Sequence, residues 1–208
     1  KGVYQAIHMS HEMCAKAVAD PRIDYVAFTG SVAGGQSVHK AAGGHLKAVG
    51  LELGGKDPAY VRSDASVIPT AQSLVDGAYF NSGQSCCGIE RIYVHESVYP
   101  EFILAFTEQV YKYRLGDPRK PDTNLGPVVR AKSAAAIREQ IDEALASGAV
   151  RLIDEKMFPL AGTGNYLAPQ ALINVDHSMR IMREETFGPV VGIMQVSSDE
   201  EAITLMND

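Results

Sequence analysis

Residues 24–55 read DYVAFTGSVAGGQSVHKAAGGHLKAVGLELGG, and this stretch contains the pattern that decides the fold class. Residues 24–30 form a short apolar run typical of a buried strand, and residues 32–44 have helical character and end in a glycine pair. Residues 47–55 form a second strand-like run. A strand, a helix and a second strand in this order make up the crossover unit of parallel sheets. The stretch therefore predicts an α/β fold.

The rest of the chain continues this alternation of short strands and amphipathic helices. Helices are predicted for residues 8–19, 66–80, 98–114 and 131–148. Strands are predicted for residues 59–63, 91–97, 150–153 and 189–196, and an extended loop for residues 115–127. Near the end of the chain, Ser198 and Glu201 have the spacing of a capping box, which predicts that a helix begins there.

The composition limits the class of protein. The 208 residues carry a net charge of -6 and scattered basic side chains, which argues against a nucleic acid or a membrane surface as partner. No apolar run approaches the roughly 20 residues that span a bilayer. The three cysteines, Cys14, Cys86 and Cys87, are too few for a disulfide framework, so we expect a soluble protein of a reducing, cytoplasmic compartment.

Two of these cysteines are adjacent in residues 80–91, FNSGQSCCGIER. A thiolate is a strong nucleophile, and Gly83 and Gly88 give the backbone around the pair freedom for close approach of a substrate. Free cysteines are more often small buried hydrophobic residues. From the local residues alone, both interpretations stay open.

Two further stretches have a chemical and a structural interpretation. Glu52 lies in the apolar run LELGG, where burial would raise its pKa and suit a general base, but an edge strand would leave it solvated. In FTGS (residues 28–31), Ser31 lies at the start of a predicted helix. One interpretation is that the first N–H groups of this helix bind a phosphate; the other is that Ser31 is an ordinary N-cap. The spacing of Gly30, Gly34 and Gly35 is not the G-x-G-x-x-G fingerprint.

The acidic pair Glu184–Glu185 in REETFGPV is typical of a solvated loop, although one carboxylate is a suitable acceptor for a ribose diol. His8, His11 and Cys14 share a helix face, but three ligands on one helix do not surround a tetrahedral ion, and we expect no metal site. A Cys–His hydrolase that pairs Cys86 with His95 or His177 is an alternative without a local signature.

Taken together, FTGS, LELGGK, FNSGQSC and EETFGPV occur in the order and with the gaps of the aldehyde dehydrogenase superfamily, which this chain resembles over essentially all its residues. The resemblance implies an aldehyde dehydrogenase-like α/β fold. Residues 1–53 would be the end of a Rossmann-like, NAD(P)-binding domain, and residues 54–208 most of the α/β catalytic domain, truncated at its C-terminus. It implies NAD or NADP as cofactor, a small aldehyde as substrate, and a homodimeric or homotetrameric parent enzyme.

The resemblance also implies roles for individual residues. Cys86 would be the nucleophile that forms a thiohemiacetal and then a thioester, and Glu52 the base that activates the hydrolytic water; Cys87 would have no catalytic role. The cofactor-binding positions would be Gly30, Ser31, Gly35, Leu53, Gly54, Glu185 and Phe187.

The departures from the family pattern matter equally. The family's Pro-Trp-Asn segment, which supplies an oxyanion-hole Asn, is absent because the chain contains no Trp. We therefore expect an internal fragment of a longer enzyme that has little activity by itself. A coenzyme A-acylating enzyme and a non-catalytic structural relative are the alternatives within this fold. Glu52 argues against the acylating type, because its members generally lack this base.

Overall fold

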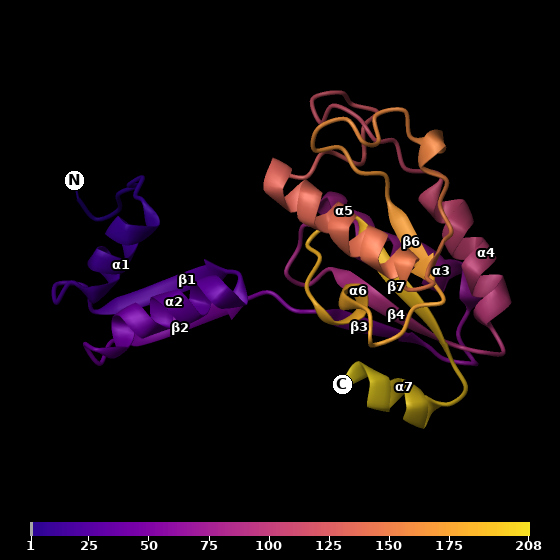
Figure 1. Ribbon diagram of the computed structural model, residues 1–208, viewed down its shortest axis with the longest axis horizontal. Coiled ribbons are helices and arrows are strands. Elements are labelled where there is room, and N and C mark those ends of the chain that lie inside the picture. The colour runs from indigo at the N-terminus through magenta and orange to yellow at the C-terminus, as the bar shows by residue number, and fades with distance from the viewer. Residues whose placement is uncertain (1) are drawn as a thin grey trace. The chain divides into compact units, whose positions relative to one another are not determined.

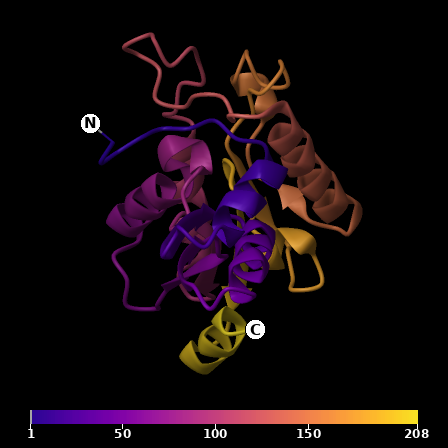
Figure 2. The same cartoon turned by 90° about the vertical axis from the view of Figure 1, so that its left-hand side faces the viewer.

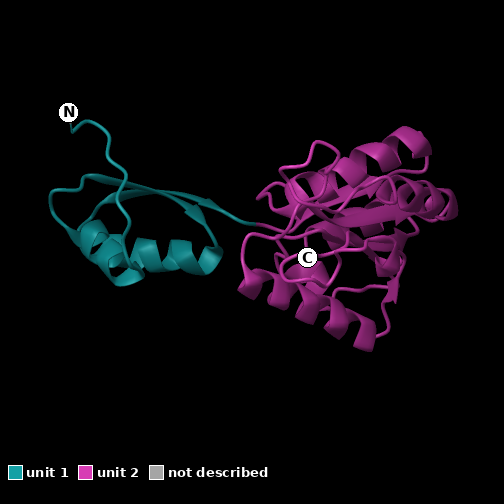
Figure 3. Ribbon diagram, turned by 90° about the horizontal axis from the view of Figure 1, so that it is seen from above, with its two compact units in different colours: residues 1–54 teal, residues 55–208 magenta. Residues whose placement is uncertain are grey.

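The computed structural model describes residues 2–208 and divides at Gly54 into two compact units, residues 1–54 and residues 55–208 (Figure 3). In this part of the chain, no helix combines the length and the apolar character needed to cross a membrane. Both units have α/β architecture, which confirms the predicted fold class.

Unit 1 contains the predicted strand–helix–strand crossover. It consists of α1 (His11–Ala19), β1 (Tyr25–Gly30), α2 (Val32–Gly43) and β2 (Ala48–Leu53) (Figure 1). The two strands pair in parallel, from Tyr25 opposite Ala48 to Gly30 opposite Leu53. Helix α1 begins three residues later than predicted because the Ser10 side chain caps it, accepting a hydrogen bond from the Met13 N–H at 3.2 Å.

Unit 2 is built on a five-stranded sheet with the order β3-β4-β7-β6-β5. Its strands are β3 (Asp57–Val61), β4 (Ile89–His95), β5 (Val150–Arg151), β6 (Gln170–Ile173) and β7 (Val190–Val196). All neighbouring strands are parallel except β5, which pairs antiparallel with β6 at one edge. The helices are α3 (Val67–Tyr79), α4 (Tyr99–Val110), α5 (Ala131–Ala146), α6 (Arg180–Arg183) and α7 (Asp199–Met206).

Side chains of the sheet alternate between two hydrophobic cores, one on each face. Ile92 and Val94 of β4 pack in the core beneath α3 and α4, whereas Tyr93 points into the core beneath α5 and α6. Figures 1 and 2 show these helix pairs on opposite sides of the sheet. Because both faces are covered, most side chains of the central strands β4 and β7 are apolar, as in parallel strands generally; the charged exceptions are Glu90 and Arg91 at the start of β4.

The last helix, α7, is fixed to the sheet by polar contacts. The Ser198 side chain accepts a hydrogen bond from the Glu201 N–H at 3.2 Å, which confirms the predicted helix start. The Tyr60 hydroxyl donates to the Asp199 carboxylate at 2.7 Å, and burial together with this bond raises the pKa of Tyr60 to about 12. Arg91 donates to the Met206 carbonyl at 3.1 Å near the other end of the helix.

The fold makes a direct prediction about α4. Phe106 is fully buried and packs against Phe102 and Tyr79, with ring centroids 5.6 and 6.1 Å away. Phe106→Ala should therefore lower the free energy of unfolding by about 3–5 kcal/mol. Leu104 lies on the same helix but is 68% exposed, so Leu104→Ala should change it by less than about 1 kcal/mol. Urea denaturation measures both, and equal losses would contradict this packing.

Candidate active site

The motifs of unit 2 meet because three parallel strands begin side by side. Strand β4 lies between β3 and β7, and the three run in the same direction. Lys56 precedes β3, Cys86 precedes β4 by three residues, and Glu185 precedes β7 by five. Since the strands are parallel, the segments before them lie at one edge of the sheet. This is the N-terminal edge, opposite to the edge that usually holds ligands in open parallel sheets.

The segment before Cys86 has an unusual backbone. After α3, the residues Asn81, Ser82 and Gly83 have φ angles of +52°, +58° and +69°, so three consecutive residues are left-handed. Such conformations cost non-glycine residues roughly 1–3 kcal/mol each and persist only where other contacts fix them. Asn and Gly tolerate this region best, which accounts in part for the Asn-Ser-Gly sequence.

Side chains of this segment attach it to residues 126–129. The Ser82 hydroxyl donates to the Gly126 carbonyl at 2.9 Å and accepts from the Gly126 N–H at 3.1 Å. The Gln84 side-chain oxygen accepts from the Val129 N–H at 2.9 Å. These contacts join positions more than 40 residues apart. They hold the strained backbone in place, and with it the cysteine two residues later.

Both adjacent cysteines are exposed. Burial as small hydrophobic residues, the commoner role of free cysteine, is therefore wrong for Cys86 and Cys87. The Cys87 sulfur lies 3.3 Å from the Ser85 hydroxyl, whereas no hydrogen bond within residues 2–208 involves the Cys86 sulfur. Cys86 is thus a thiol that a reagent can approach.

The segment before β7 packs directly against the cysteine loop. A side chain at Gly83 would collide with the carbonyl oxygen of Gly188, and one at Gly188 would collide with the side chain of Ile137. Gly83 thus lets the backbones of FNSGQSC and EETFGPV touch, whereas Gly188 leaves room for Ile137 of α5. These two close approaches explain physically why both motifs have glycine at these positions.

Behind these segments lies a buried ion pair that the sequence analysis did not identify. The Lys56 ammonium is 2.6 Å from the Glu90 carboxylate, and the two side chains are 7% and 5% exposed. The Glu90 carboxylate also accepts hydrogen bonds from the Thr186 and Phe187 N–H groups, both at 2.8 Å. Burial lowers the pKa of Lys56, although the charge of Glu90 opposes this shift. The available signal was the charged pair Glu90–Arg91 inside the strand-like run from Ile89 to Val94.

Glu185 and Phe187 lie beside this pair. Glu185 is half-buried, and burial followed by the charge of Glu90 raises its pKa. Phe187 is 43% exposed and has a φ of +50°, a strained backbone for a phenylalanine. Glu184 is exposed and forms an ion pair with Arg180 at 2.9 Å, as expected of a solvated acid. The two adjacent glutamates therefore have different surroundings.

The remaining predicted residues belong to unit 1. Ser31 caps α2 and accepts from the Gly34 N–H at 3.2 Å, in agreement with its interpretation as an N-cap. Gly35 is buried, and a side chain there would lie 2.6 Å from Leu53, so this glycine lets α2 pack on β2. Gly30 and Leu53 are half-buried and end the two paired strands; Gly54, also half-buried, follows β2.

Glu52 is exposed on β2, opposite Thr29 of β1. The burial considered from the sequence is not found within unit 1, where the solvated alternative describes this side chain.

The alternatives that use histidine find no geometric support. His95 contacts the Ser97 hydroxyl at 2.8 Å, and His177 contacts the Tyr93 hydroxyl at 2.8 Å and the Asp208 carboxylate at 2.6 Å. Both side chains thus hydrogen-bond to groups other than Cys86, and the structure shows no Cys–His pair that would support the hydrolase interpretation among residues 2–208. His8 precedes α1, and among residues 2–208 no three His, Cys, Asp or Glu side chains gather as metal ligands would.

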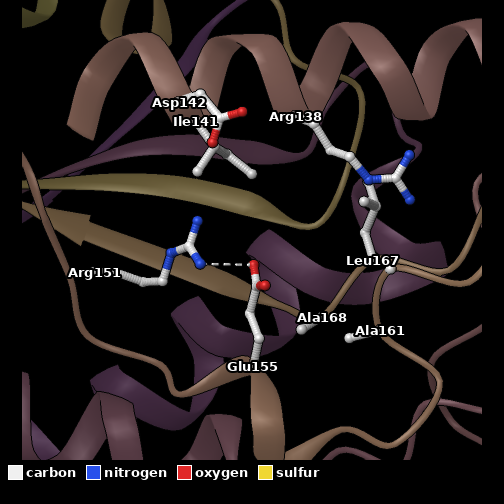
Figure 4. Close-up of a pocket in the computed structure, with 9 residues that line it drawn as sticks. Arg138, Ile141, Asp142, Arg151, Glu155, Ala161, Leu167 and Ala168 are labelled. Carbon is white, nitrogen blue, oxygen red and sulfur yellow. Dashed lines mark ion pairs between the residues drawn. The ribbon is translucent and has the colours of Figure 1, made fainter. Parts of the chain in front are cut away.

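A separate pocket of about 230 Å³ lies beneath α5 (Figure 4). Its charged lining residues are Arg138, Asp142, Arg151 and Glu155. Arg151 and Glu155 form an ion pair at 3.0 Å, and the four charges compensate one another. The pocket contains no residue of the four motifs, and we assign no chemistry to it.

The contact between the two loops predicts the effect of a single methyl group. Gly83→Ala adds a side chain against the Gly188 carbonyl at a φ of +69°. Gly162 has a φ of +82° but open space around it, so Gly162→Ala tests the backbone strain alone. We expect Gly162→Ala to cost about 1–2 kcal/mol of unfolding free energy, and Gly83→Ala at least about 2 kcal/mol more. Equal losses in urea denaturation would show that the loops do not touch.

Comparisons with known proteins agree over the whole chain. The aldehyde dehydrogenase family model matches residues 1–208. The chain is 36% identical over 206 residues to a succinate-semialdehyde dehydrogenase [NADP(+)] of Mycobacterium ulcerans, covering 99% of this chain and 44% of that protein. It is 38% identical to vanillin dehydrogenase of Pseudomonas fluorescens, over 95% of this chain and 40% of that protein.

A solved structure is also similar. The succinic semialdehyde dehydrogenase of Streptococcus pyogenes, in complex with NADP+, superimposes with a TM-score of 0.89 at 33% identity, covering 96% of this chain and 44% of that one. The chain thus spans less than half the length of these relatives. With a family match over all 208 residues and all four motifs in place, the chain belongs to the aldehyde dehydrogenase family.

Proposed function

We propose that the protein oxidises an aldehyde to a carboxylic acid with NAD+ or NADP+, and that Cys86 is the nucleophile. The observation that carries the proposal is the exposed Cys86 on a strained loop that packs against the Glu185-containing segment. The names of the relatives support the reaction class, since they include dehydrogenases of succinate semialdehyde, vanillin and lactaldehyde. The substrate class is a small aldehyde.

The proposed chemistry begins with the Cys86 thiolate, which attacks the aldehyde carbonyl to form a thiohemiacetal. The Cys86 backbone N–H stabilises the oxyanion; removal of one such donor typically costs about 3–4 kcal/mol of transition-state stabilisation. A nicotinamide held near Cys86 would supply the hydride acceptor for the thiohemiacetal, whose oxidation would leave a thioester on Cys86. Glu52 removes a proton from water, which attacks the thioester and releases the carboxylic acid and the thiol.

Each unit, taken by itself, contains residues suited to binding part of a nicotinamide nucleotide. Glu185 presents a half-buried carboxylate that would accept hydrogen bonds from the nicotinamide ribose. Gly30, Ser31 and Gly35 lie at the strand-to-helix turn of unit 1, where the positive end of α2 would favour the pyrophosphate. Leu53, Gly54 and Phe187 would lie near the nicotinamide. Unit 1 would accordingly be part of the cofactor domain and unit 2 part of the catalytic domain.

Two finer points complete the proposal. We favour hydrolysis of the thioester over its transfer to coenzyme A, because Glu52 provides an exposed base for water. The functional protein would be a homodimer or homotetramer, and a non-catalytic relative is disfavoured because Cys86, Glu52 and Glu185 are all present.

The assignment of the nucleophile predicts opposite outcomes for adjacent thiols. In the natural protein that carries this chain, Cys86→Ala should reduce aldehyde-dependent formation of NAD(P)H by at least about 1,000-fold. Cys87→Ala removes the neighbouring exposed thiol and should change the rate by less than about tenfold. Absorbance of the reduced nicotinamide measures both, and an active Cys86→Ala variant would refute the assignment.

The role of Glu52 predicts where the reaction stops. Glu52→Gln retains the shape of the side chain but removes the base, so hydride transfer should continue and thioester hydrolysis should slow by about 100-fold or more. A burst of NAD(P)H followed by slow turnover, together with an acyl adduct on Cys86 in mass spectra, is the expected result. Unchanged steady-state turnover without an adduct would exclude Glu52 as the base.

A further inference from the structure

We propose that Glu90, paired with Lys56, is a positioning residue that holds residues 185–187 in the conformation that binds the nicotinamide nucleotide. This inference rests on the function proposed above, because it assigns cofactor binding to Glu185. It assigns a role to Glu90, which belongs to none of the four motifs. Its buried partner Lys56 is the last residue of LELGGK.

Glu90 lies at a bulge in the pairing of β3 with β4. Between β3 and β4 the partners change from Asp57 with Ile89 to Pro58 with Arg91, so Glu90 is an extra residue without a partner on β3. Such a bulge re-aims the side chain of the additional residue, and bulges are frequent next to active sites. Pro58 has no N–H to donate at this point, which is consistent with the interrupted ladder.

The Glu90 carboxylate accepts three hydrogen bonds, two of them from the adjacent residues Thr186 and Phe187. One oxygen accepts from the Phe187 N–H at 2.8 Å, and the other accepts from the Thr186 N–H at 2.8 Å and from the Lys56 ammonium at 2.6 Å. Lys56 also donates to the Thr186 hydroxyl at 2.9 Å. Both charges are nearly inaccessible to water, so each depends on the other and on these donors.

These bonds act on Thr186 and Phe187, the two residues that directly follow Glu185. Thr186 directly follows Glu185, and Phe187 adopts a left-handed backbone with a φ of +50°. An isolated phenylalanine would leave this conformation, so the bond from its N–H to Glu90 stabilises the turn. If the turn relaxes, the preceding Glu185 carboxylate moves with the backbone. Glu90 therefore acts on the cofactor through Glu185 and does not touch it.

The test compares two glutamates, Glu90 and Glu184, which both lie close to residues 185–187 but differ in their surroundings. Glu90→Gln keeps the side-chain length but replaces one acceptor oxygen by an NH2 group that faces a backbone N–H or the Lys56 ammonium. Glu184→Gln is the matched control, since Glu184 precedes the same motif, is exposed and pairs only with Arg180. Both variants are made in the natural protein that carries this chain.

Two readouts are measured on each variant. Hydrogen exchange of residues 184–190 without nucleotide reports whether the segment is held, and calorimetric titration with NAD+ and NADP+ reports the dissociation constant. We expect Glu90→Gln to accelerate exchange in this segment and to raise the dissociation constant at least about 10-fold. Glu184→Gln should leave both within about twofold of the wild type.

The outcomes separate this inference from the function on which it rests. A folded Glu90→Gln variant with wild-type exchange, or with faster exchange and unchanged nucleotide affinity, overturns the positioning role. If wild-type protein binds neither nucleotide, the proposed function fails, and the exchange measurement still decides whether Glu90 holds the segment. If Glu90→Gln does not fold, Glu90→Asp decides by the same criteria, because it keeps the charge but is too short to reach all three donors.

Discussion

The parallel pairing of β3, β4 and β7 is the constraint on which the rest of unit 2 depends. Parallel strands require long crossover connections, so each strand begins where a separate segment of chain returns to the same sheet edge. Here those segments contain Lys56, Cys86 and Glu185, which are separated by up to 129 positions in the sequence. The hydrophobic cores on both faces fix the sheet and thereby fix this convergence.

Within that convergence, backbone contact and buried charge have different physical roles. The contact of Gly83 with Gly188 is a steric limit, and it determines how closely the two loops approach. The Lys56–Glu90 pair instead fixes the backbone of residues 186–187, because the Glu90 carboxylate accepts hydrogen bonds from the N–H groups of both residues. A buried ion pair adds little net stability, but loss of one partner typically costs about 3–5 kcal/mol. Such a pair favours one specific arrangement over other compact ones.

Local sequence patterns predicted most elements, with boundary errors of a few residues. Apolar runs predicted β1, β2, β4 and β7, and the caps at Ser31 and Ser198 marked two helix starts. Strand β6 and helix α6 were missed because each spans only four residues, too few to show a period. The end of α4 was placed four residues late, since its amphipathic pattern continues past Val110.

The sequence by itself determined the fold class, the order of the four motifs and the identity of the candidate nucleophile. The fold class follows from the hydrophobic period and the capping residues. The choice of Cys86 follows from the resemblance of the four motifs to the aldehyde dehydrogenase family, because the local residues do not distinguish it from Cys87. Only the tertiary structure decided that Cys86 and Cys87 are exposed, that Gly83 faces Gly188, and that Glu90 is buried against Lys56. Those facts depend on which strands lie side by side. They cannot be predicted from the sequence pattern of one segment, because the hydrophobic period of a segment does not indicate which distant segment it contacts.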